Sequence, residues 1–325
     1  MICRFFAPLF VSERKQIAIM ADEKSPARIS HRLIATSRSE MRNIMKLKFS
    51  KMHGTGNDYV YVNGFTEKLD NPSETAIKVS DRHFAIGSDG LIIVAPSEVA
   101  DVRMIMFNSD GSEGKMCGNG IRCVAKYAYD HNLTDKKEMT IETASGIKTI
   151  KVTVDENNKV EYAEVNMGKA ILKPADIPMK AEGDSFIAKE VTVNGATYVA
   201  TAVSMGNPHM VIFTHGIDEL NLDEIGPYFE NQELFPEKVN TEFVEVIDDH
   251  NFKMRVYERG TGETMSCGTG TCAVTVAAVL NGFAKYGEEL NIHIRGGELK
   301  DTYYEDGTVI MKGKATHVFD GEIEI

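Results

Sequence analysis

Short runs of alternating or continuous apolar residues, separated by Gly, Asn and Asp, dominate the chain from residue 46 onward. Such runs over strand lengths predict β-strands. We expect strands at 46–52, 58–64, 91–94, 102–107, 139–143 and 147–154, and again at 159–167, 197–205, 209–213, 252–257, 290–295 and 308–313. The pattern therefore predicts a sheet-rich protein with few helices.

Two segments depart from this pattern, and each follows a Cys-Gly-x-Gly turn. We expect helices at 121–130 and 271–280, of which the second is apolar on almost every side and stops at Asn281 and Gly282. A helix without a polar face must be enclosed by other elements. Strands that wrap one such helix in each half of the chain describe a pair of similar α+β units.

Composition limits the class of partner. The 325 residues include 36 Lys and Arg against 48 Asp and Glu, a net charge of -12. Nucleic acid and anionic membranes both require a basic face, so we expect neither as a partner and a small molecule instead. Five cysteines, an odd number spread over a long chain, indicate a reducing, cytoplasmic setting. No run after residue 45 approaches the roughly 18 apolar residues of a membrane-spanning helix.

The first 44 residues differ in charge from the rest. They carry eight Lys and Arg against four Asp and Glu, whereas the remaining chain carries 28 and 44. The apolar stretch at 5–11 contains a proline and has no small-residue cleavage site after it, which argues against a signal peptide. We interpret residues 1–44 as a leader that is disordered or belongs to a mis-assigned start, with Met45 as the natural first residue, and a basic transit-type segment is the alternative.

The two Cys-Gly-x-Gly turns carry the candidate chemistry. CGNG at 117–120 has a counterpart in CGTG at 267–270, 150 residues later. Glycines at a helix N-terminus leave N–H groups open to an anion such as a carboxylate, and the same field is expected to lower a cysteine pKa toward neutrality. If the two loops face each other, one thiolate removes a proton from a carbon between them while the other thiol protonates the opposite face. Such a pair inverts a stereocentre.

We expect the cysteines inside the two predicted helices to have only a structural role. We expect Cys123 and Cys272 to be inert and buried. A zinc site that pairs Cys117 with Cys123, or Cys267 with Cys272, does not have CxxC spacing, so we expect no metal. The chain has neither a phosphate-binding loop motif nor a dinucleotide fingerprint after a strand, so we expect no cofactor.

Five motifs, taken together and in order, resemble those of diaminopimelate epimerases. They are KMHGTGNDYVYV (51–62), FNSDGSEGKMCGNGIRC (107–123), SMGNPH (204–209), FPEKVN (235–240) and YERGTGETMSCGTGTCA (257–273). The resemblance extends from about Met45 to the C-terminus. It implies a cofactor-independent isomerase that interconverts LL- and meso-2,6-diaminoheptanedioate, on the route to lysine and peptidoglycan.

The resemblance also implies roles for individual residues. Cys117 and Cys267 match the two acid/base thiols, and His209 and Glu258 match side chains close to them and important for catalysis. Ten residues match the substrate-binding positions of the family, namely Asn57, Asn108, Gly118, Asn119, Asn207, Asn240, Glu258, Arg259, Gly268 and Thr269. Those in the two cysteine loops match residues whose N–H groups hold the reacting carboxylate. An Arg for the distal carboxylate and a Glu for an ammonium group suit a substrate with two amino-acid ends. One departure is Gly90, where some members of the family have Gln.

The fold class that we expect is α+β, with two pseudo-symmetric domains. Each is a mixed β-barrel-like sheet wrapped around a central helix, and the active site lies in the cleft between them. The resemblance implies a last strand that returns to the first domain. This gives 45–160 plus 314–325 as the first lobe and 161–313 as the second, with a homodimer as the candidate assembly.

Two other functions stay open on the sequence alone. One is another cofactor-independent amino-acid racemase, similar to proline racemase, with the same thiol pair. Asn119, the other matched asparagines, Glu258 and Arg259 favour a longer substrate with a second amino-acid end. The other is a non-catalytic binding module on the same scaffold, for which the expected sign would be the loss of one of the two cysteines.

We predict that a chain beginning at Met45 keeps its melting temperature and its epimerase activity, because residues 1–44 show no apolar periodicity and lie outside the family pattern. Thermal denaturation and turnover of the shortened and full-length chains check this. A clear loss of either property would show that the leader packs on the body.

Overall fold

The structure is a computed structural model that describes residues 46–325, and the leader predicted for residues 1–44 lies outside them. In the first half, strands and helices follow in this order: β1 (Lys46–Gly54), β2 (Asn57–Asn63), α1 (Pro72–Ser80), β3 (Gly90–Ala95), β4 (Val102–Asn108), β5 (Glu113–Gly114), α2 (Gly118–Asp130), β6 (Glu138–Thr143), β7 (Gly146–Val154) and β8 (Val160–Lys169).

The second half repeats this mixture of many strands and few helices. Its elements are β9 (Lys189–Val193), β10 (Ala196–Ser204), β11 (Pro208–Phe213), α3 (Leu222–Glu230), β12 (Asn240–Val246), β13 (Asn251–Glu258), β14 (Gly262–Glu263), α4 (Gly268–Leu280), β15 (Glu289–Ile294), β16 (Gly297–Tyr303), β17 (Thr308–Lys314) and β18 (Thr316–Glu324), with 3-10 turns at Pro174–Asp176 and Ile217–Glu219. Every strand expected from the apolar pattern is present.

Both expected helices are present, and each begins three residues earlier than predicted. α2 starts at Gly118 and α4 at Gly268, because the glycines of the two turns form the first turn of each helix instead of a loop before it. Cys117 and Cys267, in extended backbone conformation, are the residues that cap the two helices. The predicted turn therefore places each cysteine directly at a helix N-terminus.

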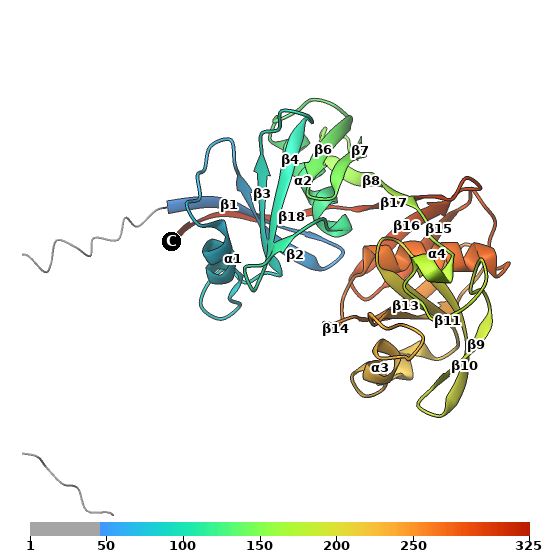
Figure 1. Cartoon of the computed structure of the whole chain (residues 1–325). Helices are drawn as coiled ribbons and strands as arrows, with labels where there is room; N and C mark the ends of the chain where they lie inside the picture. Colours follow the sequence, from blue (N-terminus) through green and yellow to red (C-terminus); the bar gives the residue numbers. More distant parts are fainter. Residues whose placement is uncertain (1–45) are drawn as a thin grey trace, which may run out of the picture. The chain divides into compact units, whose positions relative to one another are not determined.

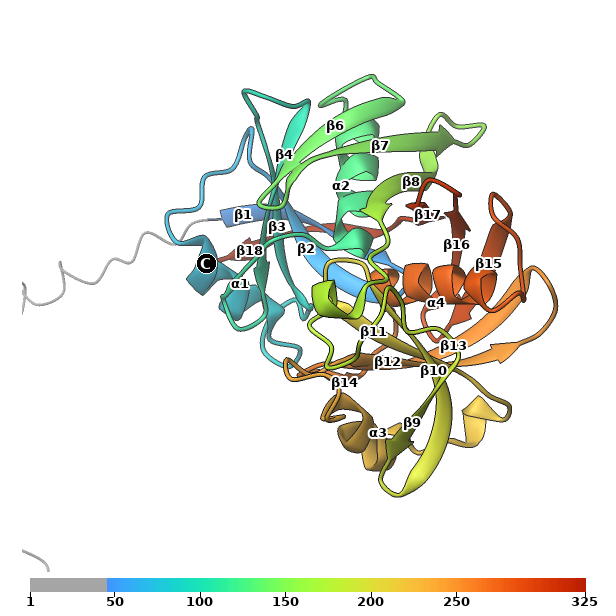
Figure 2. The ribbon, with the colours of Figure 1, turned by 45° about the vertical axis from the view of Figure 1, so that its right-hand side comes forward.

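Each central helix is enclosed by strands, as predicted. α2 packs against β8 and β1, and α4 packs against β16 and β10. Figure 1 shows α2 among the strands of the first half and α4 among those of the second, and in Figure 2 the end of each helix that carries its N-terminus faces the middle of the molecule. Among residues 46–325, no helix is long and apolar enough to cross a membrane. These observations confirm the expected α+β fold with two similar halves.

Strands β8 and β17 connect the two halves, because they pair antiparallel with each other. On its other side β8 pairs antiparallel with β7, and after β17 the last strand, β18, pairs antiparallel with β1. The chain thus ends in the sheet where its described part begins, as expected for a returning last strand. The lobe boundaries near residues 160 and 314 stay predictions.

Helices α1 and α3 were not expected from the sequence. The side chain of Asn71 caps α1, whereas α3 contains Gly226 and Pro227, which are both poor helix formers. A Cβ atom at Gly226 would lie 2.1 Å from the Tyr257 ring, so α3 needs glycine there to pack on β13. Tertiary packing therefore produces a helix where the local sequence disfavours one.

The core around the two central helices contains charged side chains. Arg122 of α2 and Asp301 of β16 are both completely buried, and neither oxygen of the Asp301 carboxylate has a hydrogen-bond partner. Burial raises the pKa of Asp301 to about 7, because a charged carboxylate loses its hydration, and the positive charge of Arg122 opposes the rise only in part.

We predict that Asp301 makes stability depend on pH. The folded pKa of about 7 lies above the ordinary value of 3.8, so the stabilisation from the protonated form is complete below about pH 4 and is lost as the pH rises through 7. Asp301→Asn should remove this slope. Melting temperatures of both proteins between pH 4 and 8 check it, and parallel curves for the two would contradict the prediction.

Candidate active site

The N-termini of α2 and α4 converge on one buried side chain. Met311 of β17 lies against both glycine turns, because a Cβ atom added at Gly118 would be 2.9 Å from its Cε and one added at Gly268 would be 3.0 Å from its Sδ. Only glycine allows both helix ends to approach this strand so closely. The two cysteine loops are thereby brought together from positions 150 residues apart in the chain.

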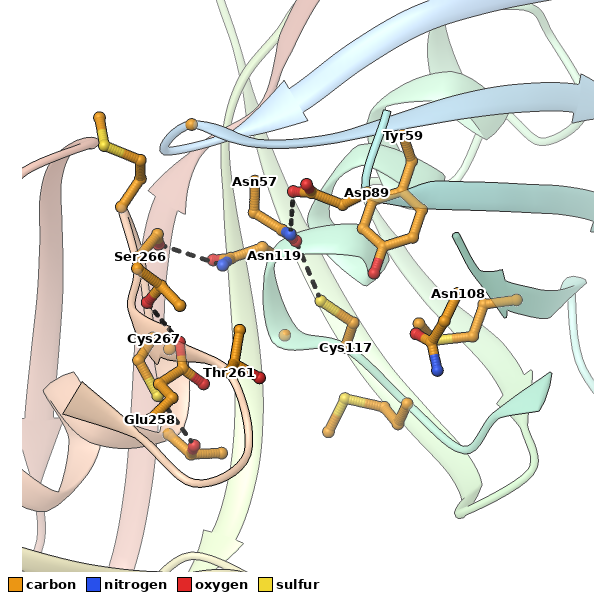
Figure 3. Close-up of a pocket in the computed structure, with 18 of the residues that line it drawn as sticks. Asn57, Tyr59, Asp89, Asn108, Cys117, Asn119, Glu258, Thr261, Ser266 and Cys267 are labelled. Carbon is orange, nitrogen blue, oxygen red and sulfur yellow. Dashed lines mark hydrogen bonds between the residues drawn. The ribbon is translucent and has the colours of Figure 1, made fainter. Parts of the chain in front are cut away.

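A buried polar bridge ties the two loops to each other. The Asn119 amide nitrogen donates to Ser266 Oγ at 3.1 Å (Figure 3), and the hydroxyls of Ser266 and Thr55 lie 2.6 Å apart. The Arg122 guanidinium donates to Asn119 Oδ1 at 2.8 Å. The Asn119 side chain is therefore engaged within the protein, and only its backbone N–H remains for the anion-binding role that the sequence suggests.

Between the loops lies a cavity of about 1120 Å³. Both cysteines line it, and Figure 3 shows them on opposite sides, one at the end of each central helix. The residues predicted for the site that line the cavity are Asn57, Asn108, Cys117, Gly118, Asn119, Asn207, Glu258, Cys267, Gly268 and Thr269. The structure thus brings together ten of the predicted positions from both halves of the chain.

Cys117 is half-buried and has amide neighbours. Its Sγ donates to Asn57 Oδ1 at 3.3 Å and accepts from the Gly120 N–H at 3.4 Å. Asn57 is oriented in turn by Asp89, whose carboxylate accepts from the Asn57 amide nitrogen at 2.7 Å (Figure 3). This orientation leaves the amide oxygen facing the sulfur, so it accepts the thiol proton.

Cys267 is buried and has acidic neighbours. Its Sγ lies 3.6 Å from the Thr269 hydroxyl, and its own side chain makes no capping bond to α4. Glu258, which accepts a hydrogen bond from the Thr264 hydroxyl, lies beside it in the cavity (Figure 3). Burial raises the pKa of Glu258, and the hydrogen bonds from Thr264 and Cys267 oppose that rise.

The expected lowering of the thiol pKa by the helix N-termini is wrong for this structure. Burial raises the pKa of Cys117, and the N–H groups of Gly120 and Asn119 only oppose the rise. The pKa of Cys267 rises further, first because of burial and then because of the charges of Glu258 and Glu242. At both thiols, desolvation by burial therefore exceeds the opposing effect of the helix N–H groups.

Comparison with known proteins identifies the family. The family described as diaminopimelate epimerase matches residues 49–173 and 201–318. The chain belongs to this family. A diaminopimelate epimerase of Agathobacter rectalis is 52% identical over 287 residues, which cover 86% of this chain and 100% of that protein. One of Desulfovibrio desulfuricans is 54% identical over 286 residues, covering 86% of this chain and 99% of that protein.

A solved structure with much lower sequence identity shares the fold. The phenazine biosynthesis protein of the PhzF family from Bacillus anthracis superposes with a TM-score of 0.63 at 18% identity, over 87% of this chain and 100% of that chain. At this identity the likeness concerns the architecture alone. It agrees with the two enclosed helices described above, and the family assignment depends on the sequence matches.

Three predicted site residues lie outside the cavity lining. His209 is fully buried behind it, with Nε2 3.2 Å from Asn207 Oδ1. Asn240 is also buried, and its amide bridges the Pro208 carbonyl and the Arg259 N–H. The Arg259 side chain is exposed and donates to the Glu237 carbonyl at 2.8 Å. These three residues therefore do not contact the cavity space in this conformation.

Position 90 is closed to any side chain. A Cβ atom at Gly90 would lie 2.1 Å from the Phe107 carbonyl oxygen, because β4 pairs with β3 at this point. A side chain at position 90 would therefore require β3 and β4 to move apart. Tyr59, which the same Cβ atom would also approach, lines the cavity here.

Sequence reasoning missed several cavity residues. Lys115, Thr264 and Ser266 lie within the motifs that contain the cysteines, so their closeness to Cys117 and Cys267 was an available signal. Arg82 had no such signal, because it follows α1 and reaches the cavity wall through ion pairs with Asp58 and Asp89. Lys115 and Arg82 supply positive charge at this wall.

We predict that iodoacetamide alkylates Cys117 before Cys267 in the free protein at neutral pH. Only the thiolate reacts, and Cys267 is both more deeply buried and raised further in pKa, so Cys117 should be labelled first. Peptide mapping of partly modified protein measures the order. Faster labelling of Cys267 would show that its acidic neighbours do not control its ionisation.

Proposed function

We propose that this protein epimerises LL-2,6-diaminoheptanedioate to the meso form with Cys117 and Cys267 as its acid/base pair. The observation that carries the proposal is that two thiols, each at the N-terminus of a central helix, line one cavity from opposite sides in a chain of the diaminopimelate epimerase family. Geometry and family agree on a reaction that needs one proton acceptor and one proton donor.

The reaction moves one proton at each face of the α-carbon. A thiolate on one side takes the α-proton, the electron pair stays on the carbon and its carboxylate, and the opposite thiol delivers its own proton to the other face. The proton count is unchanged, and the configuration is inverted. Each turnover leaves the two thiols with exchanged protonation states, so the enzyme is ready for the reverse direction.

The loops between the thiols stabilise the carbanion. The first N–H groups of α2 and α4 have no acceptor within their helices, and Gly118, Asn119, Gly268 and Thr269, which carry them, line the cavity. Two positive helix ends at one carboxylate are expected to stabilise the charge that develops there. We assign these four residues to the reacting carboxylate.

The rest of the cavity suits the second amino-acid end. Asn57, Asn108 and Asn207 offer amide groups along the wall, and Glu258 offers a carboxylate for an ammonium group. We assign Arg259 to the distal carboxylate, which requires its side chain to leave the Glu237 carbonyl and turn toward the cavity. Arg259→Ala should then raise KM with a smaller effect on kcat.

The family suggests the cellular setting of this reaction. We place it on the cytoplasmic route to lysine and peptidoglycan precursors, with diaminopimelate as the small-molecule partner and no cofactor in the chemistry. A homodimer stays the candidate assembly. These statements follow from the family and the reducing setting that the cysteines indicate.

A proline-racemase-like activity is the second candidate, because the thiol pair alone suits any small α-amino acid. The sequence matches favour diaminopimelate, since they extend over nearly the whole of relatives that carry that name. A binding module without catalysis is disfavoured, because both cysteines are present at the cavity. Circular dichroism assays with diaminopimelate and with proline separate the first two candidates.

We predict that incubation with LL-diaminopimelate in deuterated water places deuterium at the α-carbon of the product. Cys117→Ala and Cys267→Ala should each lower epimerisation by about 10²- to 10⁴-fold, because each removes one of the two acid/base groups. Mass spectrometry and circular dichroism measure the two effects. Near-normal turnover in either variant would exclude the two-thiol reaction.

Cys123→Ala and Cys272→Ala are the matched controls. Both cysteines are completely buried within the central helices, and neither lines the cavity. We expect these variants to keep wild-type turnover within a few-fold, since a cysteine in a core behaves as a small apolar residue.

A further inference from the structure

Helix α2 carries a cation into the core close to its N-terminus. Arg122 is completely buried, and its Nε has no hydrogen-bond partner among residues 46–325. Burial lowers the pKa of Arg122, but a guanidinium stays protonated at neutral pH. A buried charge is costly unless an opposite charge compensates it, so the position of this cation requires an explanation.

The guanidinium is held by the first turn of its own helix. It donates from Nη1 to the Gly118 carbonyl at 3.0 Å and from Nη2 to Asn119 Oδ1 at 2.8 Å. Two longer contacts reach the Thr55 hydroxyl at 3.4 Å and Met311 Sδ at 3.7 Å. Because a guanidinium carries donors only, the Asn119 atom that faces it is the oxygen. All of these acceptors are neutral, so the groups that Arg122 contacts do not compensate its charge.

The carboxylate that faces Arg122 at longer range is Asp301 of β16. Neither of its oxygens accepts a hydrogen bond from the guanidinium. Its pKa of about 7 lies close to neutral pH, so the carboxylate is ionised only in part there. The full positive charge of Arg122 therefore faces only a partial negative charge in the core.

Cys117 lies at the same end of α2 (Figure 3). The Gly120 N–H donates to Cys117 Sγ at 3.4 Å, and the Asn119 N–H also stabilises the thiolate. The peptide group between Gly118 and Asn119 is planar and trans, so its carbonyl points to the guanidinium while its N–H points the opposite way. A donor at the carbonyl polarises this peptide and strengthens its N–H as a donor. The cation thus acts on the sulfur through the first turn of the helix.

The charge of Arg122 also acts on the sulfur directly. It lowers the pKa of Cys117 and opposes the effect of burial, and a Cys117 thiolate in turn raises the pKa of Arg122. The direct charge and the polarised peptide have the same sign, since both favour the thiolate.

The second loop has no such cation. Arg122 is five residues after Cys117, and the residue five after Cys267 is Cys272, which is completely buried. Burial raises the pKa of Cys272 well above its ordinary value, so Cys272 is a neutral thiol. The repeated turns therefore differ at the position behind the sulfur, with a cation behind Cys117 and a neutral group behind Cys267.

We propose that Arg122 is a positioning residue for Cys117, whose thiolate it stabilises as a buried counter-charge. It acts through the first turn of α2 and through space, and it does not line the cavity. The thiolate is the anion that the core lacks, so the cost of the buried cation is offset when Cys117 ionises. The proposal deepens the proposed function, on which it rests for the meaning of a Cys117 thiolate.

Arg122→Met tests this role, because methionine keeps an apolar stem and removes the charge. The Thr55 hydroxyl, 3.4 Å from Asn119 Oδ1, is a second donor for that oxygen, and an apolar side chain in place of a buried charge is often tolerated. We expect the ionisation midpoint of Cys117 to rise by about one pH unit, so that iodoacetamide labelling slows about tenfold at neutral pH. A merely structural role predicts the opposite, since a loosened first turn would expose the sulfur and speed its labelling.

The measurement is site-resolved alkylation of the free full-length protein across pH, followed by peptide mapping. The titratable groups that face Cys117 are Glu258 of β13, Tyr59 and Tyr61 of β2, Arg122 and Cys123 of α2 and, beyond Asn57, Asp89. We expect the midpoint of Cys267 in the same molecule to be unchanged, because the charges that act on it are those of Glu258 and Glu242. Faster or unaltered labelling of Cys117, or a lower plateau at the same midpoint, overturns the proposal.

Lys126→Met is the matched control, because Lys126 is a second buried cation on α2, one turn farther from Cys117. Its charge is compensated by Asp130, 2.8 Å away. This variant should leave the Cys117 midpoint unchanged. An equal rise would mean that any cation on α2 has the effect, which overturns the specific role of Arg122.

Arg122→Gln separates the charge from the hydrogen bonds, and it provides the test if the methionine variant does not fold. Its amide nitrogen keeps a donor for the first turn but carries no charge, so the Cys117 midpoint should rise as in Arg122→Met. A normal midpoint in this variant would show that the hydrogen bonds alone act on Cys117, and it overturns the counter-charge. Because labelling needs no substrate, a failure of the proposed epimerisation would leave this result unaffected.

Discussion

The meeting of two helix N-termini is the arrangement on which the rest of the site depends. The N-termini of two helices each carry a partial positive charge, so they repel each other when they are brought close together. Here they are held by Met311 beneath the glycines and by the buried bridge of Asn119, Ser266 and Thr55. Because this bridge lies within the protein and away from solvent, its hydrogen bonds orient the loops rigidly. The thiols face one cavity only because this contact exists.

The repeated loop produces two different thiols. Cys117 donates to an amide oxygen and is half-buried, whereas Cys267 is buried next to Glu258 and near Glu242. The repeated turn therefore places one thiol among neutral polar groups and the other among carboxylates. A reaction that inverts a stereocentre needs a donor and an acceptor at the same time, and unequal surroundings provide a physical reason for the two thiols to differ in protonation.

Buried charge accumulates around the two central helices. Arg122, Glu242 and Asp301 are completely buried, and each has at least one polar atom without a partner. Such groups oppose folding, because their hydration is lost without full compensation. Buried charges of this kind are typical of sites at which stability is given up for function.

Local patterns in the sequence were sufficient for the strands, the two central helices and the placing of a cysteine at each helix start, because these features depend on alternation and on glycine turns. Ten cavity residues were also found: the repeated turn indicated the two cysteines and the glycines that follow them, and the resemblance to diaminopimelate epimerases indicated the others. The tertiary structure decided what depends on distant neighbours. Burial reversed the expected pKa shift of both thiols, the Asn119 amide nitrogen donates to Ser266, and the side chain of Arg259 donates to the carbonyl of Glu237 outside the cavity. Solvation and hydrogen-bond partners are set by residues far apart in the chain, so no local pattern contains them.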